Sequence, residues 1–137
     1  MNPIPKELTA LLDYSHTLAR LLLTEQGEFY PFGAYLSNAN TITQRVFPDG
    51  DDFPLSTGLI NIIKHDFDSQ LASGSVAGTA ITYAARITNI NYSEPVDVVI
   101  VRLNSKALKS PILHYFPFQL LDGKFEYLTS WTATEEI

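Results

Sequence analysis

The chain has 137 residues, of which 45% are hydrophobic and 18% are charged. This length and composition predict one soluble domain, residues 1–137, that buries enough surface to fold without a metal or a disulfide. The sequence contains no cysteine, which excludes disulfide bonds, thiolate nucleophiles and cysteine-ligated metal centres. The net charge of −6 disfavours nucleic acid or an anionic membrane as a partner, because binding to either uses clustered Lys and Arg.

The first residues predict a cytoplasmic protein. Met1 to Lys6 lack the basic start and the apolar run of a secretory signal, and they lead directly into a patterned helix. The longest uncharged stretch, Ser69 to Ala85, is interrupted by glycines and hydroxyl residues, and it falls short of the roughly 20 apolar residues that a membrane helix needs. We therefore expect no membrane partner.

Apolar residues recur at helical spacing from Pro5 to Leu23, and we predict a helix over this range. Its main apolar stripe consists of Leu8, Leu11, Leu12, Leu18, Ala19, Leu22 and Leu23. Ala10, Tyr14 and Leu21 form a second apolar flank, so the helix is apolar over more of its circumference than one sheet face covers. The sequence therefore predicts a second contact for this helix, which we interpret as self-association.

Two strands and a second helix are expected next. The ranges Phe29–Leu36 and Thr41–Phe47 are rich in aromatic and β-branched residues and flank a turn sequence, which predicts a β-hairpin. Pro31 cannot donate a ladder hydrogen bond and predicts an edge or a bulge. The acidic stretch 47–53 predicts a surface loop, and the apolar spacing from Pro54 to Ala72 predicts the second helix.

From residue 79 the apolar period changes from 3.6 to 2, which predicts four further strands. Their ranges are Thr79–Thr88, Val96–Leu103, Ile112–Leu121 and Lys124–Ser130. Asp122-Gly123 is a two-residue hairpin signal, and Pro117 again predicts an edge or a bulge. The element order of helix, two strands, helix and four strands predicts an α+β fold. In it, two helices pack on one mostly antiparallel sheet, and the hairpin joins the final meander edge to edge.

Few groupings of side chains in this sequence point to chemistry. The only local cluster of imidazole and carboxylate groups is His65, Asp66 and Asp68. Such a cluster on one helix supplies too few ligands for a zinc site, so we expect a solvated helix face. Glu28 and His114 have no partner near them in the sequence. The sequence therefore predicts no catalytic residues, no metal and no cofactor.

Aromatic residues gather in two parts of the chain, residues 29–35 and 115–131. If these segments are adjacent in the fold, their side chains form one wall that is core, a small-molecule cleft or an interaction surface. The candidate binding wall consists of Tyr30, Phe32, Tyr35, Tyr115, Phe118 and Trp131. For Phe32 we predict a core position, whereas Phe118 is left open between core and site.

The segment Gly27-Glu28-Phe29-Tyr30-Pro31-Phe32-Gly33-Ala34, between a leucine-rich helix and an acidic proline-containing loop, resembles a family of small uncharacterised bacterial proteins. This resemblance implies a bacterial cytoplasmic protein and carries no catalytic residues with it. The predicted element order also looks like the roadblock and profilin-like class of interaction modules, although the meander is one strand longer and a terminal helix is absent. The cone-shaped NTF2-like fold is a second analogue. Such analogies concern the fold, which does not fix function.

The interpretation that we favour is a non-catalytic protein-interaction or assembly module that forms a homodimer through Ala10, Tyr14 and Leu21. One alternative is an immunity protein that neutralises a basic toxin by charge complementarity. The other is an enzyme or small-ligand-binding domain that uses the aromatic wall together with Glu28, His65 or His114.

Overall fold

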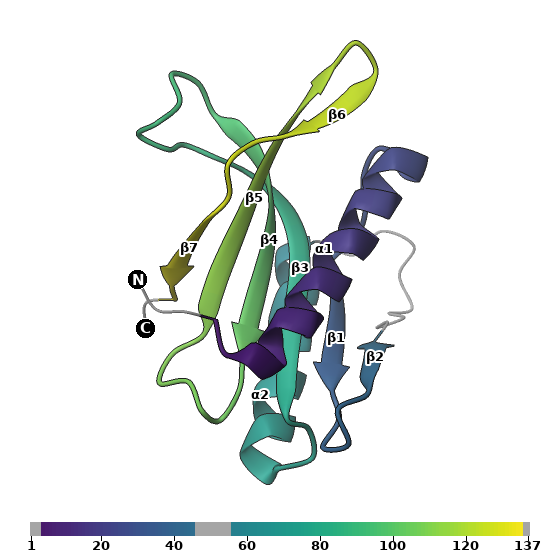
Figure 1. Ribbon diagram of the computed structural model, residues 1–137, viewed down its shortest axis with the longest axis vertical. Coiled ribbons are helices and arrows are strands. Elements are labelled where there is room, and N and C mark those ends of the chain that lie inside the picture. The colour runs from purple at the N-terminus through teal and green to yellow at the C-terminus, as the bar shows by residue number, and fades with distance from the viewer. Residues whose placement is uncertain (1–3, 46–55, 136–137) are drawn as a thin grey trace.

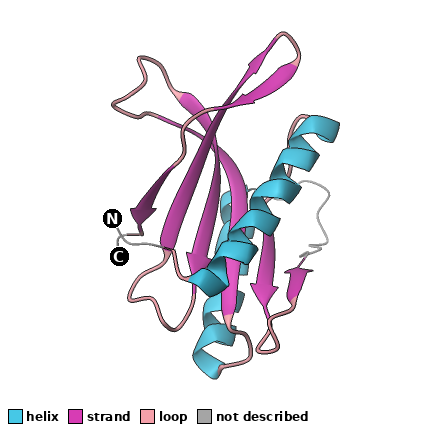
Figure 2. Ribbon diagram, in the orientation of Figure 1, coloured by secondary structure: helices cyan, strands magenta, loops and turns pink. Residues whose placement is uncertain are grey.

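The computed structural model describes residues 4–45 and 56–135. Within them, a helix and two strands precede a second helix and five strands (Figures 1 and 2). The elements are α1 (Lys6–Gln26), β1 (Phe32–Leu36), β2 (Ile42–Arg45), α2 (Ser56–Ser73), β3 (Gly78–Ile87), β4 (Val96–Asn104), β5 (Ile112–Leu121), β6 (Lys124–Tyr127) and β7 (Trp131–Thr134). All strands pair antiparallel in one sheet, which confirms the predicted α+β fold. The predicted loop 47–53 lies outside the described residues.

Helix α1 begins directly after Pro5, a residue whose fixed φ suits the start of a helix. It continues past the predicted end at Leu23 to Gln26 and stops at Gly27, which adopts the left-handed conformation with φ 79°. The Gly27 N–H donates a hydrogen bond of 2.8 Å to the Leu23 carbonyl and thereby closes the last turn. The helix lies diagonally across one face of the sheet (Figure 1).

The predicted hairpin is present as β1 and β2, with a shorter first strand. β1 begins at Phe32, so Pro31 stands just outside the ladder and the strand does not include the predicted residues 29–31. In the turn, the Ser37 hydroxyl accepts hydrogen bonds from the N–H groups of Ala39 and Thr41, at 3.2 and 3.0 Å. These bonds fix the register of the two strands.

Helix α2 packs on the sheet over β1 and β3. It ends one residue past the predicted Ala72, at Ser73, where Gly74 takes a left-handed φ of 79°. Gly33 of β1 lies directly beneath the helix, and a Cβ added there would stand 2.7 Å from the Phe67 ring. The missing side chain at Gly33 therefore lets α2 approach the sheet.

The sheet has the strand order β2-β1-β3-β4-β5-β6, so the hairpin joins the meander edge to edge as predicted. The predicted last strand, Lys124–Ser130, instead ends at Tyr127, and an additional strand, β7, pairs with β5 further along. The outer edge of β5 is thus divided: residues 118–121 pair with β6 and residues 112–115 pair with β7. Pro117 lies at this division, where its carbonyl accepts the Leu128 N–H at 2.9 Å.

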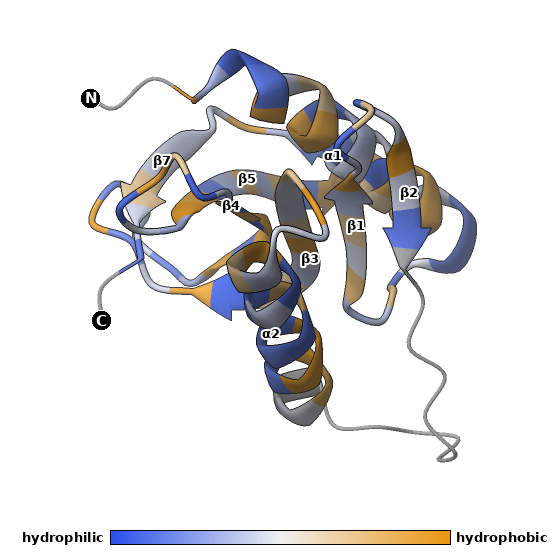
Figure 3. Cartoon of the chain, turned by 90° about the horizontal axis from the view of Figure 1, so that it is seen from below, coloured by the Kyte–Doolittle hydropathy of each residue, from blue (hydrophilic) through white to orange (hydrophobic). Residues whose placement is uncertain are grey.

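The two helices cover opposite faces of the sheet (Figure 3). On the α1 side, helix residues such as Leu11 pack against strand residues such as Phe32, Val101 and Phe118. The core on the α2 side consists of Leu59, Ile63, Phe67 and Ile81. A third cluster fills the same face beyond α2, where Tyr92, Leu128 and Trp131 cover Val96, Val98 and Ile100. No helix in residues 4–45 and 56–135 is long and apolar enough to cross a membrane.

Candidate interaction surface

The outer face of α1 presents an open apolar groove of about 530 Å³. It is lined by Ala10, Asp13, Tyr14, Thr17, Leu18 and Leu21. The opposite face of the helix packs on the sheet through Leu8, Leu11, Leu12, Ser15, Ala19 and Leu23. Leu21 leaves 50% of its surface exposed. The structure therefore brings Ala10, Tyr14 and Leu21 together on one side of α1, as the helical spacing predicts; Ala10 and Leu21 are exposed, and Tyr14 is half-buried against the core.

The six residues of the predicted aromatic wall do not share one surface, because β3 and β4 lie between β1 and β5. Phe32 and Phe118 are buried on the α1 side of the sheet, with 5% and 8% of their surfaces exposed. The predicted core position of Phe32 is confirmed, and Phe118 occupies the same core. Tyr30 precedes β1 and is 53% exposed.

The remaining aromatic residues of the predicted wall lie on the α2 side. Tyr35 packs edge-on against Phe67 beneath α2. Tyr115 and Trp131 stack with ring centroids 5.0 Å apart, one on β5 and the other on β7. Apart from the exposed Tyr30, the aromatic residues of the predicted wall thus belong to separate core clusters on the two faces of the sheet.

Two histidines from distant parts of the chain meet at Phe116 on the α1 side. His16 stacks on the Phe116 ring at 3.6 Å between centroids, and His114 stacks on it at 4.3 Å. Tyr127 meets His16 edge-on, and the Arg20 guanidinium lies 4.5 Å from the centre of the Tyr127 ring. This cluster joins α1 to β5 and β6.

The environment of the two histidines favours their neutral forms. Burial, together with the charges of Arg20 and His114, lowers the pKa of His16 to about 4. Burial also lowers the pKa of His114. The His16 Nε2 and both ring nitrogens of His114 are buried without a hydrogen-bond partner among the described residues. A proton on either ring is therefore poorly compensated.

A network of ion pairs on the α2 side connects α2, β4 and the residue after β7. Arg102 is 4% exposed in its side chain, and its Nε donates to Glu135 Oε1 at 3.0 Å. Its Nη1 donates to Asp68 Oδ1 at 3.3 Å, and Lys64 lies 3.3 Å from the Glu135 carboxylate. Burial on its own raises the pKa of Glu135, but the hydrogen bond and charge of Arg102, together with Lys64, outweigh it and leave that pKa lowered.

The sequence interpretation missed this network. Arg102 is the only charged residue between Val98 and Leu103 in an otherwise apolar run on a central strand. A buried charge requires partners, because desolvation is costly. The isolated arginine was thus a usable signal for a buried ion pair, although the sequence does not indicate that Asp68 and Glu135 are the partners.

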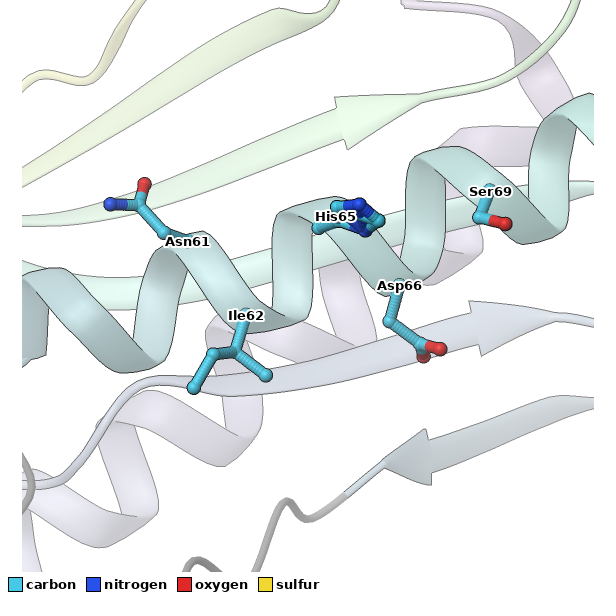
Figure 4. Close-up of a pocket in the computed structure, with 5 residues that line it drawn as sticks. All are labelled: Asn61, Ile62, His65, Asp66 and Ser69. Atoms are coloured by element: carbon cyan, nitrogen blue, oxygen red, sulfur yellow. The ribbon is translucent and has the colours of Figure 1, made fainter.

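The predicted cluster on α2 does not converge. His65 is exposed, Asp66 accepts a hydrogen bond from Gln70 at 3.0 Å, and Asp68 points to Arg102. An open groove of about 600 Å³ follows this helix face and is lined by Asn61, Ile62, His65, Asp66 and Ser69. Figure 4 shows these side chains spread along the helix. Among the described residues no group of three His, Asp or Glu side chains is arranged to hold a metal ion.

Glu28, His65 and His114 are not brought together either. Glu28 is exposed in the connection before β1, His65 is exposed on α2, and His114 stacks on Phe116 on the α1 side of the sheet. These three residues therefore form no shared site.

Comparison with known proteins adds no relative of established function. No family model matches the chain, and neither the curated proteins nor the solved structures gave a match.

Proposed function

We propose that this protein is a non-catalytic interaction module that self-associates through the outer face of α1. The observation that supports this proposal is the exposed apolar groove containing Ala10, Tyr14 and Leu21. Contiguous apolar surface of this kind on a folded domain marks sites of association. The inner face of α1 packs on the sheet, and the groove residues Tyr14 and Leu18 are only partly buried against that core.

The positions of the titratable groups with shifted pKa values also support a non-catalytic role. His16 and His114 pack under α1, and Glu135 is bound by Arg102 and Lys64. Perturbed groups of an active site face a cleft where a substrate is held. Here they serve contacts between elements of the fold.

Sedimentation velocity over a range of about 1 to 300 μM tests the proposal, because weak dimers change mass in this range. The natural chain is expected to shift from monomer to dimer. The variant Leu21→Glu places a charge in the groove and is expected to remain monomeric.

The matched control is Leu120→Glu on β5, because Leu120 is 58% exposed and lies outside the α1 groove. This variant is expected to dimerise like the natural chain. A natural chain that stays monomeric throughout, or a Leu21→Glu variant that dimerises normally, contradicts the proposal.

A second candidate function is the binding of a different, basic protein, as in the immunity-protein interpretation. Ile90 is 98% exposed in the β3–β4 connection, and Leu120 is exposed near the β5–β6 turn at the same end of the sheet (Figure 1). Glu94 and Glu126 are exposed close by in the sequence. Purification of the tagged chain from its own cells tests this function: Ile90→Ser should release a basic partner that Leu21→Glu retains.

A further inference from the structure

The outer face of α1 carries a seam of four residues, Ala10, Tyr14, Thr17 and Leu21. Their spacing of four, three and four residues keeps them on one line along the helix, and all four line the same groove. The seam is symmetric about the point between Ser15 and His16. Position 10 mirrors position 21, and position 14 mirrors position 17.

This mirror relation pairs small residues with large ones. If a second α1 packs antiparallel on the first, Ala10 faces the partner's Leu21 and Tyr14 faces the partner's Thr17. Each layer then contains one small and one large side chain, which is the arrangement that fills the space between two helices evenly. A parallel pair instead places Tyr14 against the partner's Tyr14 and leaves two alanines facing each other.

The charges beside the seam follow the same symmetry. Asp13 and Arg20 are exposed and lie two helical turns apart on one side of the seam. In an antiparallel pair related by a dyad, the same side of each helix faces the partner. Asp13 and the partner's Arg20 then differ in height along the helix axis by about 3 Å, which is two residues of rise. The dyad produces this pair twice. Arg20 also lies over the Tyr127 ring, 4.5 Å from its centre.

We propose that the partner seated on α1 is a second copy of this chain, packed antiparallel about a dyad between Ser15 and His16, with Asp13 paired to the partner's Arg20. The proposal rests on the proposed function and assigns its partner, orientation and register. The resulting assembly is a closed dimer, because each seam is buried against the other and no seam remains exposed to bind a third copy.

Charge exchange tests the ion pairs. Asp13→Arg and Arg20→Asp each place like charges together twice, and each is expected to weaken the dimer about tenfold or more at low salt. The variant that carries both changes restores opposite charges and should return the dissociation constant to within about threefold of the natural value. A doubly changed chain as weak as either single variant overturns the assigned pairing. Because Arg20→Asp also removes the contact with Tyr127, the folded state of each variant is checked by its melting curve.

Spin labelling measures the orientation independently, and the absence of cysteine makes a single label unambiguous. A label at Gln26→Cys, at the end of α1, lies about 30 Å from its copy in the antiparallel pair, given 1.5 Å of rise per residue. In a parallel pair the two labels lie level along the axis, so they are separated only by the interaxial distance of about 10 Å and by the reach of the labels themselves. A short distance in a dimer that Leu21→Glu dissociates overturns the antiparallel arrangement and leaves self-association intact. Absence of any dimer in the natural chain overturns both.

Discussion

The imidazole of His16 stacks on the ring of Phe116, with centroids 3.6 Å apart and planes inclined by 11°. The contact joins the middle of α1 to the strand β5. A proton on this imidazole introduces a charge next to Arg20 and His114 in a half-buried position. The neutral form of His16 therefore contributes to holding α1 on the sheet, and this relationship has a measurable pH dependence.

We expect the free energy of unfolding to fall as the pH falls from about 6.5 to about 4. His16 has a lowered pKa in the folded chain, so the unfolded chain binds more protons in this range and unfolding becomes easier. Above pH 6.5 the stabilising contribution of the neutral His16 imidazole is fully present. The loss is about 1 to 2 kcal/mol after a discount for solvent screening at a half-buried group. Urea unfolding at several pH values measures it.

His16→Gln is expected to make this pH profile shallower and to leave the part that comes from His114, whose pKa burial also lowers. His65→Gln, at an exposed position on α2, should leave the profile unchanged. If the two variants show the same profile as the natural chain, His16 does not carry the dependence. A further decrease that begins below about pH 4.5 is expected from Glu135, whose pKa is lowered in the folded chain.

Glu135→Gln is expected to lower the free energy of unfolding by about 1 to 3 kcal/mol, because the buried Arg102 loses one of the two charged partners that it has among the described residues. The variant should also lose less stability below pH 4.5 than the natural chain does. Asp97→Asn is the matched control: Asp97 also pairs with an arginine, Arg86, but that pair is exposed to solvent and its loss should cost clearly less stability than the loss of the Glu135 carboxylate. Equal costs for the two variants contradict the buried role of Arg102.

Phe32→Ala and Phe118→Ala are each expected to cost about 3 to 5 kcal/mol, since both side chains are buried in the α1-side core. Tyr30→Ala, two residues from Phe32 but 53% exposed, should shift the urea midpoint very little. A urea midpoint for Phe118→Ala close to that of the natural chain contradicts the core position of Phe118.

Two glycines provide opposite outcomes for the same substitution. Gly33→Ala is expected to cost about 1 to 3 kcal/mol, because the new Cβ would stand 2.7 Å from the Phe67 ring and 3.2 Å from Ile63. Gly58→Ala in α2 meets no heavy atom within 4 Å and should stabilise the fold by about 0.5 to 1 kcal/mol. Thermal unfolding checks this pair: the melting temperature should be lower than that of the natural chain for Gly33→Ala and higher for Gly58→Ala.

Periodicity predicted both helices and six of the strands, because apolar spacing directly reflects which faces are buried. It did not predict β7, since Trp131–Thr134 is short and lies close to the end of β6 in the sequence. The division of the β5 edge at Pro117 separates the two strands. Pro117 predicted a bulge or an edge, but the sequence did not show that the chain re-pairs beyond it.

The groove on α1 was also predictable, since Ala10, Tyr14 and Leu21 form a second apolar flank at helical spacing. The meeting of His16 with His114 was not, because it depends on which strand lies beneath α1. The same reason explains why the predicted aromatic wall is absent from the structure. The sequence shows where the aromatic residues lie along the chain, but only the strand order shows that β1 and β5 are not neighbours.

The divided outer edge of β5 bears on how copies of this chain can accumulate. An intact edge strand lets another sheet add by main-chain hydrogen bonds, and each addition exposes a new edge, so growth continues into fibres. On this side of the sheet, β6 and β7 offer only four residues each and are interrupted between Tyr127 and Trp131. An incoming strand finds no continuous row of donors and acceptors there. The break thus disfavours unlimited polymer growth from this edge.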